Sequence, residues 1–210
     1  MHEPDLPFSP ACERNKQPIG EVLQRLLADD SRVLEIGAGT GQHAVYFSSL
    51  LPGVEWLATD VAENLAGLKA RFALESRGRL PEPLQLDVRD RRWPSGPFDV
   101  VYTANTLHIM PFELTPLLFQ GAARVLINNG LLLCYGPFMD QGVHTADSNR
   151  RFDASLRQRN PDMGIRDTVE IFRMADAAGL QPTDDIAMPA NNRILVFRKQ
   201  PTSVTGSQTG

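Results

Sequence analysis

The sequence predicts an α/β protein with a mostly parallel sheet, and three observations support this. A short apolar run, Val33-Leu34-Glu35-Ile36, breaks into a turn rich in glycine, as a buried parallel strand does before a helix. Strand-like and helix-like segments then alternate five times, which indicates right-handed crossovers. Only four residues separate the last two strand-like segments, 184–188 and 193–197, so these must be antiparallel neighbours.

Each element has its own signal in the sequence. Pro18 can open the first helix, and Thr115 with Pro116 gives an N-cap and first helical position for a later one. After each start, apolar residues at helical spacing indicate that the helix continues. The predicted helices are 18–28, 42–51, 62–76, 115–127 and 167–178. The predicted strands, which are short apolar runs between them, are 33–36, 54–59, 84–86, 98–104 and 131–135, followed by the hairpin.

The chain divides into three predicted parts. Residues 1–17 show no periodicity and are predicted to form an irregular N-terminal arm. Residues 18–199 form the α/β domain, within which a long polar stretch, 136–164, has no assigned element. Residues 200–210 are rich in Ser, Thr and Gly, so they are predicted to be a disordered tail.

Composition narrows the class of protein. A length of 210 residues is ordinary for one domain, and a net charge of −4 argues against a general nucleic-acid or anionic-membrane surface. The first residues show neither the basic start nor the apolar core of a signal peptide, and no apolar run approaches the ~20 residues needed to span a bilayer. Two cysteines fit a reducing compartment. We therefore expect a cytoplasmic protein without a nucleic-acid or membrane partner and without a metal site. The sequence does not indicate the oligomeric state.

The turn formed by Gly37, Gly39 and Gly41, called the glycine turn below, points to a nucleotide-like cofactor. Glycines let the backbone bend and approach a ligand, and open α/β sheets bind ligands at the carboxyl ends of their strands. The dinucleotide fingerprint G-x-G-x-x-G would need a glycine at position 42, where Gln42 stands instead. A nicotinamide-dependent oxidoreductase is therefore disfavoured.

Two carboxylates accompany the glycine turn. Glu35 lies two residues before the first glycine, and Asp60 ends the next predicted strand, where a carboxylate can accept both hydroxyl protons of a ribose. This pattern resembles motif I and the following acidic residue of the class I S-adenosylmethionine (SAM) methyltransferases. The resemblance implies a Rossmann-like three-layer sandwich with SAM as cofactor. Its seven-stranded sheet would be mostly parallel, with an antiparallel last strand.

The resemblance also places other polar residues on SAM. Glu35 would order the turn or reach the amino group of SAM through water. Asp87 would accept a hydrogen bond from the adenine amine while Val88 packs on the ring. Asn105, at the end of the fourth strand, would meet the methionine end. The N-terminal arm is expected to fold over this crevice, with Arg14 and Asn15 facing SAM or the acceptor.

Three residues are candidates for a role on the acceptor. His108 follows the fourth strand and could act as a general base, because imidazole titrates near neutral pH. Asn149 and Asp153 lie four residues apart, so one helical turn would put both on one face. His43 could equally contact the cofactor or serve only the start of its helix. We expect segments 9–16 and 136–153 to form the acceptor pocket together with His108.

Several longer stretches resemble one small family, the methyltransferase-like 26 family, which is also catalogued as a domain of unknown function. The resemblance covers roughly residues 9–198 and implies a SAM-dependent methyltransferase fold without a known substrate. The stretches that carry it are 9–16, 39–44, 104–109, 135–138, 148–156, 164–167 and 188–192.

The expected function is methyl transfer from SAM to a small-molecule O, S or N acceptor. The chain adds little to the core fold that could hold a macromolecular substrate. Asn105 also lacks the following Pro-Pro-aromatic run that holds a flipped base. The alternative left open is a SAM-binding protein without catalysis, either a sensor or a subunit of a partner enzyme.

Overall fold

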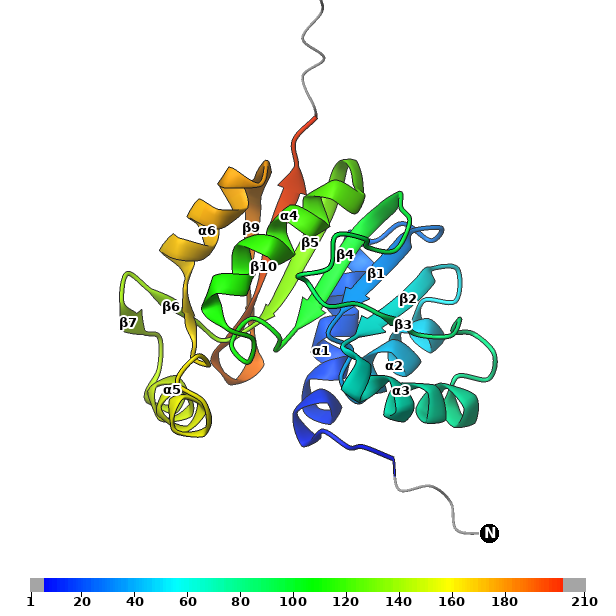
Figure 1. The fold of residues 1–210 in the computed structure, drawn as a ribbon, viewed down its shortest axis with the longest axis horizontal. Helices are drawn as coiled ribbons and strands as arrows, with labels where there is room; N and C mark the ends of the chain where they lie inside the picture. The colour runs from blue at the N-terminus through cyan, green and yellow to red at the C-terminus, as the bar shows by residue number, and fades with distance from the viewer. Residues whose placement is uncertain (1–5, 202–210) are drawn as a thin grey trace, which may run out of the picture.

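A seven-stranded sheet forms the middle layer of the protein (Figure 1). The structure is a computed structural model that describes residues 6–201. Five neighbouring strands are parallel, and β10 is antiparallel to both of its neighbours, so the predicted fold class and terminal hairpin are confirmed. The strands, in order across the sheet, are β3 (Leu84–Gln85), β2 (Glu55–Asp60), β1 (Arg32–Ile36), β4 (Phe98–Ala104), β5 (Leu126–Gly136), β10 (Asn192–Lys199) and β9 (Leu180–Met188).

Helices cover both faces of the sheet because its strands are apolar on both sides. In β1, Val33 packs in one core cluster and Leu34 in the other, as alternate residues of a strand do. One face is covered by α1 (Pro10–Leu26), α2 (Gln42–Leu50) and α3 (Ala62–Glu75). The other is covered by α4 (Thr115–Val125) and α6 (Thr168–Ala177). The carboxyl ends of the parallel strands all point to one edge, the lower edge in Figure 1.

The first helix starts earlier than predicted, so the irregular arm predicted over residues 1–17 is wrong for residues 10–17. Helix α1 begins at Pro10, and the Ser9 hydroxyl caps it by accepting from the Cys12 N–H at 3.3 Å. Pro18 lies inside α1 instead of opening it. Because proline has no N–H group, the Arg14 carbonyl loses its bond within the helix.

The polar stretch between β5 and α6 also contains regular structure. Helix α5 (Asp147–Arg159) lies beside a small sheet of order β7-β6-β8, formed by Val143–His144, Phe138–Asp140 and Arg166–Asp167. Two short 3-10 turns, η1 (Phe112–Leu114) and η2 (Pro189–Asn191), complete the elements of the described chain. Within residues 6–201, no helix is both long and apolar enough to cross a membrane. Most of the predicted tail, residues 202–210, lies outside the described residues.

Candidate functional site

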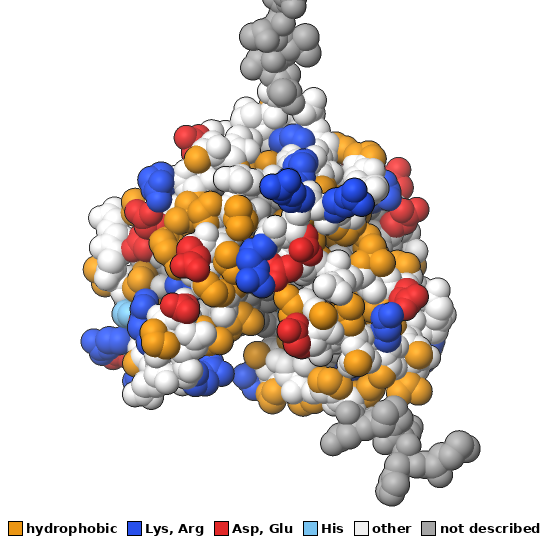
Figure 2. Space-filling view, in the orientation of Figure 1, with side chains coloured by type: hydrophobic (Ala, Val, Ile, Leu, Met, Phe, Trp, Pro, Cys, Tyr) orange, Lys and Arg blue, Asp and Glu red, His pale blue; other side chains and the backbone are white. Residues whose placement is uncertain are grey.

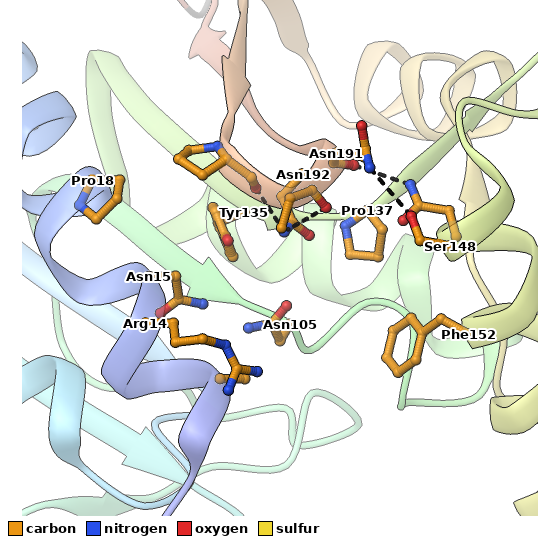
Figure 3. Close-up of a pocket in the computed structure, with 14 residues that line it drawn as sticks. Arg14, Asn15, Pro18, Asn105, Tyr135, Pro137, Ser148, Phe152, Asn191 and Asn192 are labelled. Carbon is orange, nitrogen blue, oxygen red and sulfur yellow. Dashed lines mark hydrogen bonds between the residues drawn. The ribbon is translucent and has the colours of Figure 1, made fainter.

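A cavity of about 850 Å³ lies at the carboxyl edge of the sheet, between α1 and α5. Figure 2 shows the molecule hollowed at this edge, and Figure 3 shows the side chains that surround the space. The structure thus brings the segment around residues 11–18 and the 135–152 region to one place. The lining residues are Ala11, Arg14, Asn15, Pro18, Asn105, Tyr135, Pro137, Ser148, Asn149, Phe152, Pro189, Ala190, Asn191 and Asn192.

The lining is rich in amides and poor in charge. Five asparagines take part, and among the described lining residues Arg14 carries the only charge. Asn105 has a left-handed backbone (φ 58°), and its N–H donates to the Tyr135 carbonyl at 2.8 Å. The Asn149 amide donates to the Asn191 carbonyl at 3.0 Å, which fixes α5 against η2. An amide both donates and accepts hydrogen bonds, while Tyr135, Phe152 and three prolines add apolar surface, so this lining suits a small ligand with polar and apolar parts.

A buried chain of polar groups holds Asn15 in the cavity wall. Asn15 Oδ1 lies 2.7 Å from Nε2 of His43, and the Tyr102 hydroxyl lies 3.3 Å from Nδ1 of the same ring. Burial lowers the pKa of His43 to about 4, so the ring is neutral at pH 7. Since Asn15 Oδ1 can only accept, Nε2 carries the proton and Nδ1 accepts from Tyr102. His43 therefore links α1 to α2 and β4.

All three glycines have left-handed backbones, but the space around each differs. A Cβ on Gly37 would lie 2.6 Å from Thr106 Oγ1, and one on Gly41 would lie 2.9 Å from a Leu68 methyl group, so both are needed for packing. A Cβ on Gly39 (φ +57°) would meet nothing within 4 Å. Gly41 is also the N-cap residue of α2 and gives this helix no side-chain cap. The open space over Gly39 and the uncapped helix start fit the methionine end of a SAM molecule.

Asp60 lies where a ribose partner is expected, and it also orders the turn. Its Oδ2 accepts from the Gly39 N–H at 2.6 Å, and its Oδ1 accepts from the Val61 N–H and the Asn64 amide. A carboxylate offers about four acceptor positions. One position therefore remains for a ribose hydroxyl, and a second becomes available if Asn64 moves. The residues present fit SAM at this end of the crevice.

Of the two roles expected for Glu35, ordering the turn or reaching the amino group of SAM, its surroundings favour the first. Its carboxyl group is buried, and its Oε2 accepts from the Trp56 indole N–H at 2.8 Å in the core beneath α2. Burial, aided by the charge of Asp60, raises the pKa of Glu35 to about 7. Glu35 thus orders the strand below the glycine turn, and in this structure its bonded oxygen is turned to the core.

The predicted adenine partners lie on the loop that follows β3. The Asp87 carboxylate accepts from the Arg89 guanidinium at 2.9 Å, and this partner lowers the pKa of Asp87. Val88 packs against the core under α4. An adenine amine would have to share or displace Arg89 to reach Asp87, so the adenine role of both residues stays a prediction.

Two of the predicted acceptor-side residues do not line the cavity. The His108 ring is buried edge-on to Phe152, with ring centroids 5.3 Å apart. Asp153 accepts from the Ile165 N–H at 2.7 Å and from Arg157 at 3.0 Å, so it joins α5 to the chain before β8. Asn149 and Asp153 share the buried face of α5, as the spacing predicts, but only Asn149 reaches the cavity. This geometry does not support a base role for His108 or Asp153.

The buried state of His108 leads to a testable pH dependence. Burial, reinforced by the nearby positive charges of Arg166 and Arg159, lowers its pKa from 6.5 to about 4. Between pH 6.5 and 4, the His108 ring therefore binds a proton in the unfolded chain but not in the folded chain. The free energy of unfolding then falls as the pH falls. Between pH 7 and 5, we expect the free energy of unfolding to fall by about 2 kcal/mol less in His108→Gln than in the parent. Urea unfolding of both proteins at the two pH values measures this. An equal loss in both would show that His108 titrates freely in the folded protein.

Some residues of the site gave little signal in the sequence. Arg71 is buried on α3 and donates a hydrogen bond to the Thr40 carbonyl within the glycine turn. In the sequence it is visible only as a charged residue beside Phe72, in the apolar stripe of that helix. Phe152 lies in segment 136–153, which was expected to form the acceptor pocket, and Asn191 and Asn192 lie in stretch 188–192, but the sequence singled out none of the three as a site residue.

The strand order of the sheet defines a Rossmann-like fold, which solved structures of SAM-dependent methyltransferases share. Human N-acetylserotonin methyltransferase in complex with SAM is 16% identical, with a TM-score of 0.76 over 91% of this chain and 53% of that one. A putative O-methyltransferase from Nostoc punctiforme is 17% identical, with a TM-score of 0.77 over 90% and 56%. An O-methyltransferase family protein from Burkholderia thailandensis is 19% identical, with a TM-score of 0.76 over 90% and 57%. This chain thus spans little more than half the length of these proteins.

A family model described as "Protein of unknown function (DUF938)" matches residues 6–199. The chain therefore belongs to the DUF938 family.

Proposed function

We propose that the protein transfers a methyl group from SAM to a small-molecule acceptor held in the cavity. The observation that carries the proposal is that the glycine turn and the cavity adjoin each other. Thr106 packs directly against Gly37 of the turn, and the preceding residue, Asn105, lines the cavity. A ligand over Gly39 and a second ligand beside Asn105 would therefore be neighbours. The stretches that resemble the methyltransferase-like 26 family and the fold shared with O-methyltransferases support the same proposal.

Bound SAM would supply a methyl group already activated by a positively charged sulfur. The turn around Gly39 would hold the methionine end of SAM, and Asp60 would bind the ribose. Asn105 would bind the polar groups of SAM that lie nearest the cavity. The task of the cavity residues is then to align an acceptor and exclude water, and alignment contributes roughly 7–11 kcal/mol in the best intramolecular models.

The chemistry of the cavity favours certain acceptors. Its volume of about 850 Å³ suits a small molecule. Arg14 contributes a positive charge, and no carboxylate occurs among the described lining residues, so a neutral or anionic acceptor is favoured over a cationic one. Two free cysteines, Cys12 and Cys134, occur in the described chain and support the proposal that the protein works in the reducing cytoplasm.

A second candidate function is SAM binding without catalysis, in a sensor or a partner subunit. It is favoured by the absence of an imidazole or carboxylate from the described lining of the cavity, since His108 and Asp153 are both engaged elsewhere. Calorimetry with SAM, S-adenosylhomocysteine and NAD tests the cofactor. Binding of the first two but not NAD is expected, and binding of NAD alone would overturn the proposal. Turnover then distinguishes the enzyme from the sensor.

Asn149 and Asp153 provide a matched pair for testing the cavity. We expect Asn149→Ala to keep SAM affinity near that of the parent while methyl transfer falls, because this residue lines the cavity and its amide holds α5 to Asn191, which also lines it. Asp153→Ala should instead lower the free energy of unfolding by roughly 1–3 kcal/mol, because it leaves the buried Ile165 N–H unbonded. Calorimetry, urea unfolding and transfer of labelled methyl are measured on each variant. Loss of SAM binding in Asn149→Ala would move this residue to the cofactor site.

A further inference from the structure

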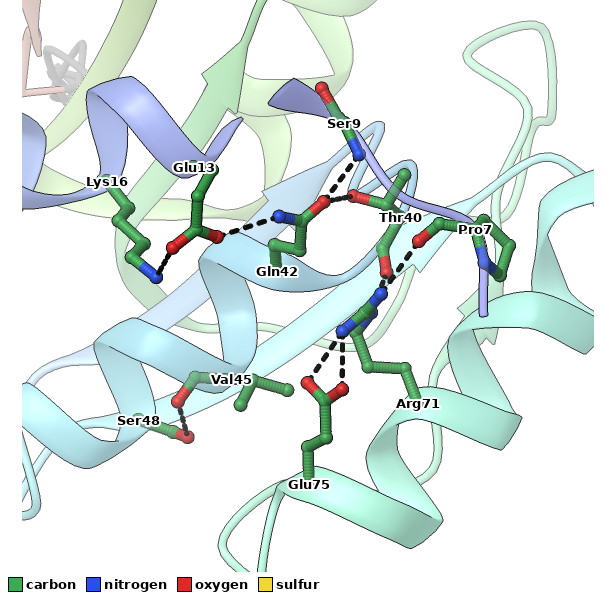
Figure 4. A network of polar contacts seen from close by, with 10 residues as sticks. All are labelled: Pro7, Ser9, Glu13, Lys16, Thr40, Gln42, Val45, Ser48, Arg71 and Glu75. Atoms are coloured by element: carbon green, nitrogen blue, oxygen red, sulfur yellow. Dashed lines mark hydrogen bonds and ion pairs between the residues drawn. The ribbon is translucent and has the colours of Figure 1, made fainter. Parts of the chain in front are cut away.

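Residues 6–9, which we call the N-terminal strap, run from α3 to the start of α1 beside the glycine turn (Figure 4). Pro7 lies on α3 at Gly67, where an added Cβ would come within 2.8 Å of the proline ring. Gly67 therefore leaves the space that the strap fills. Ser9 ends the strap and caps α1, the helix that carries Arg14 and Asn15 to the cavity.

A buried arginine joins the strap to the glycine turn. The Arg71 guanidinium donates from Nε to the Thr40 carbonyl at 2.6 Å and from Nη2 to the Pro7 carbonyl at 2.7 Å. Its remaining nitrogen pairs with Glu75 at 2.6 Å. The guanidinium group is planar and rigid, so its two carbonyl partners are held at a fixed separation. Arg71 is only 5% exposed, which makes the loss of either bond costly.

A buried glutamine forms a second link between the same two segments. Oε1 of Gln42 accepts from the Ser9 N–H at 2.7 Å and from the Thr40 hydroxyl at 3.0 Å. Its Nε2 donates to Glu13 of α1 at 3.0 Å. Thr40, which lies between the last two glycines of the turn, is thus bonded through its carbonyl and through its hydroxyl to groups that also hold the strap.

We propose that Arg71 and Gln42 are positioning residues for the cofactor, which keep the glycine turn in its binding shape while the strap is docked. The inference rests on the proposed function, because it assumes that SAM lies over Gly39. Neither side chain comes within 4 Å of a Cβ placed on Gly39, so both act through Thr40. Docking of the strap holds Thr40 in place, so it strengthens SAM binding at the turn. By thermodynamic linkage, SAM then strengthens strap docking by the same factor.

The test compares Arg71→Met, which keeps an unbranched side chain but has no hydrogen-bond donor, with Glu75→Gln, which leaves both carbonyl bonds in place. We expect SAM affinity to fall about tenfold in Arg71→Met and to stay within about twofold in Glu75→Gln. The second readout is chymotrypsin cleavage after Phe8, identified by mass. SAM should slow this cleavage in the parent and not in Arg71→Met.

Removal of the strap gives an independent measurement. A variant lacking residues 2–8 should bind SAM about as weakly as Arg71→Met, and combining both changes should weaken binding no further. Parent-like affinity in Arg71→Met, or losses that add in the combined variant, would overturn the inference. If Arg71→Met does not fold, the deletion variant decides alone, and parent-like affinity there would also overturn it. A parent protein that binds no SAM would contradict the proposed function instead.

Discussion

Gly39→Val is expected to weaken SAM binding by at least about a hundredfold, or more than about 2.7 kcal/mol. Two effects combine in this variant. Gly39 has a φ of +57°, a conformation that a β-branched residue adopts only with strain. The valine side chain would also occupy the open space above the turn, where the proposed cofactor lies. The dissociation constant is measured by calorimetry on protein shown by circular dichroism to be folded.

Gly78→Val is the matched control for strain. Gly78 has a φ of +74° with nothing within 4 Å of an added Cβ, and it lies in the loop between α3 and β3. The two substitutions should destabilise the fold by similar amounts, roughly 1–2 kcal/mol each. Only Gly39→Val should lose SAM binding. If both variants bind SAM within a few-fold of the parent, the space over Gly39 is not the cofactor site.

Asp60→Ala is expected to weaken SAM binding by about a hundredfold as well. Each hydrogen bond from a ribose hydroxyl to a charged carboxylate contributes about 1.5–3 kcal/mol at most. The structure adds a second reason, because Asp60 also accepts from the Gly39 N–H and so fixes the turn itself. The variant should therefore lose stability as well as affinity, and both are measured by calorimetry.

Asn64→Ala is the control for Asp60. In the parent, the Asn64 amide donates to the Asp60 carboxylate at 2.8 Å. The substitution removes this hydrogen bond and leaves the carboxylate itself unchanged. SAM affinity in Asn64→Ala should stay near that of the parent or rise slightly, since an acceptor position becomes available. An Asp60→Ala variant that binds SAM normally would remove the ribose assignment.

The sheet was predictable because its signals are local. The run around Leu34, the glycine turn and the short link between the last two strands each fix one element or one pairing without distant information. The start of α1 was missed for a physical reason. Its first turns border the cavity and solvent, so they lack the apolar stripe that begins at Ile19, and Pro18 looked like a helix start. Helix α5 was missed similarly, because its buried face includes Asn149 and Asp153.

The site was predictable only in its outline. The ends of the strands had to converge, which placed Asp60 and Asn105 at one edge. Which groups a side chain actually meets depends on distant segments. Asp153 meets the backbone of Ile165, and Arg71 meets Pro7, 64 residues away in the chain. Pairings of this kind have no periodic signal in a single sequence.

The proposed function requires that the chain transfer a methyl group from SAM to a small molecule. Its most direct test is to incubate the purified protein with methyl-labelled SAM and a small-molecule extract of the cells that make it. Label should pass into one or a few low-molecular-weight products, and Asp60→Ala should reduce the transfer in line with its weaker SAM binding. Firm binding of SAM by the parent, with no label leaving SAM in any extract, would contradict the claim and favour a SAM-binding protein without catalysis.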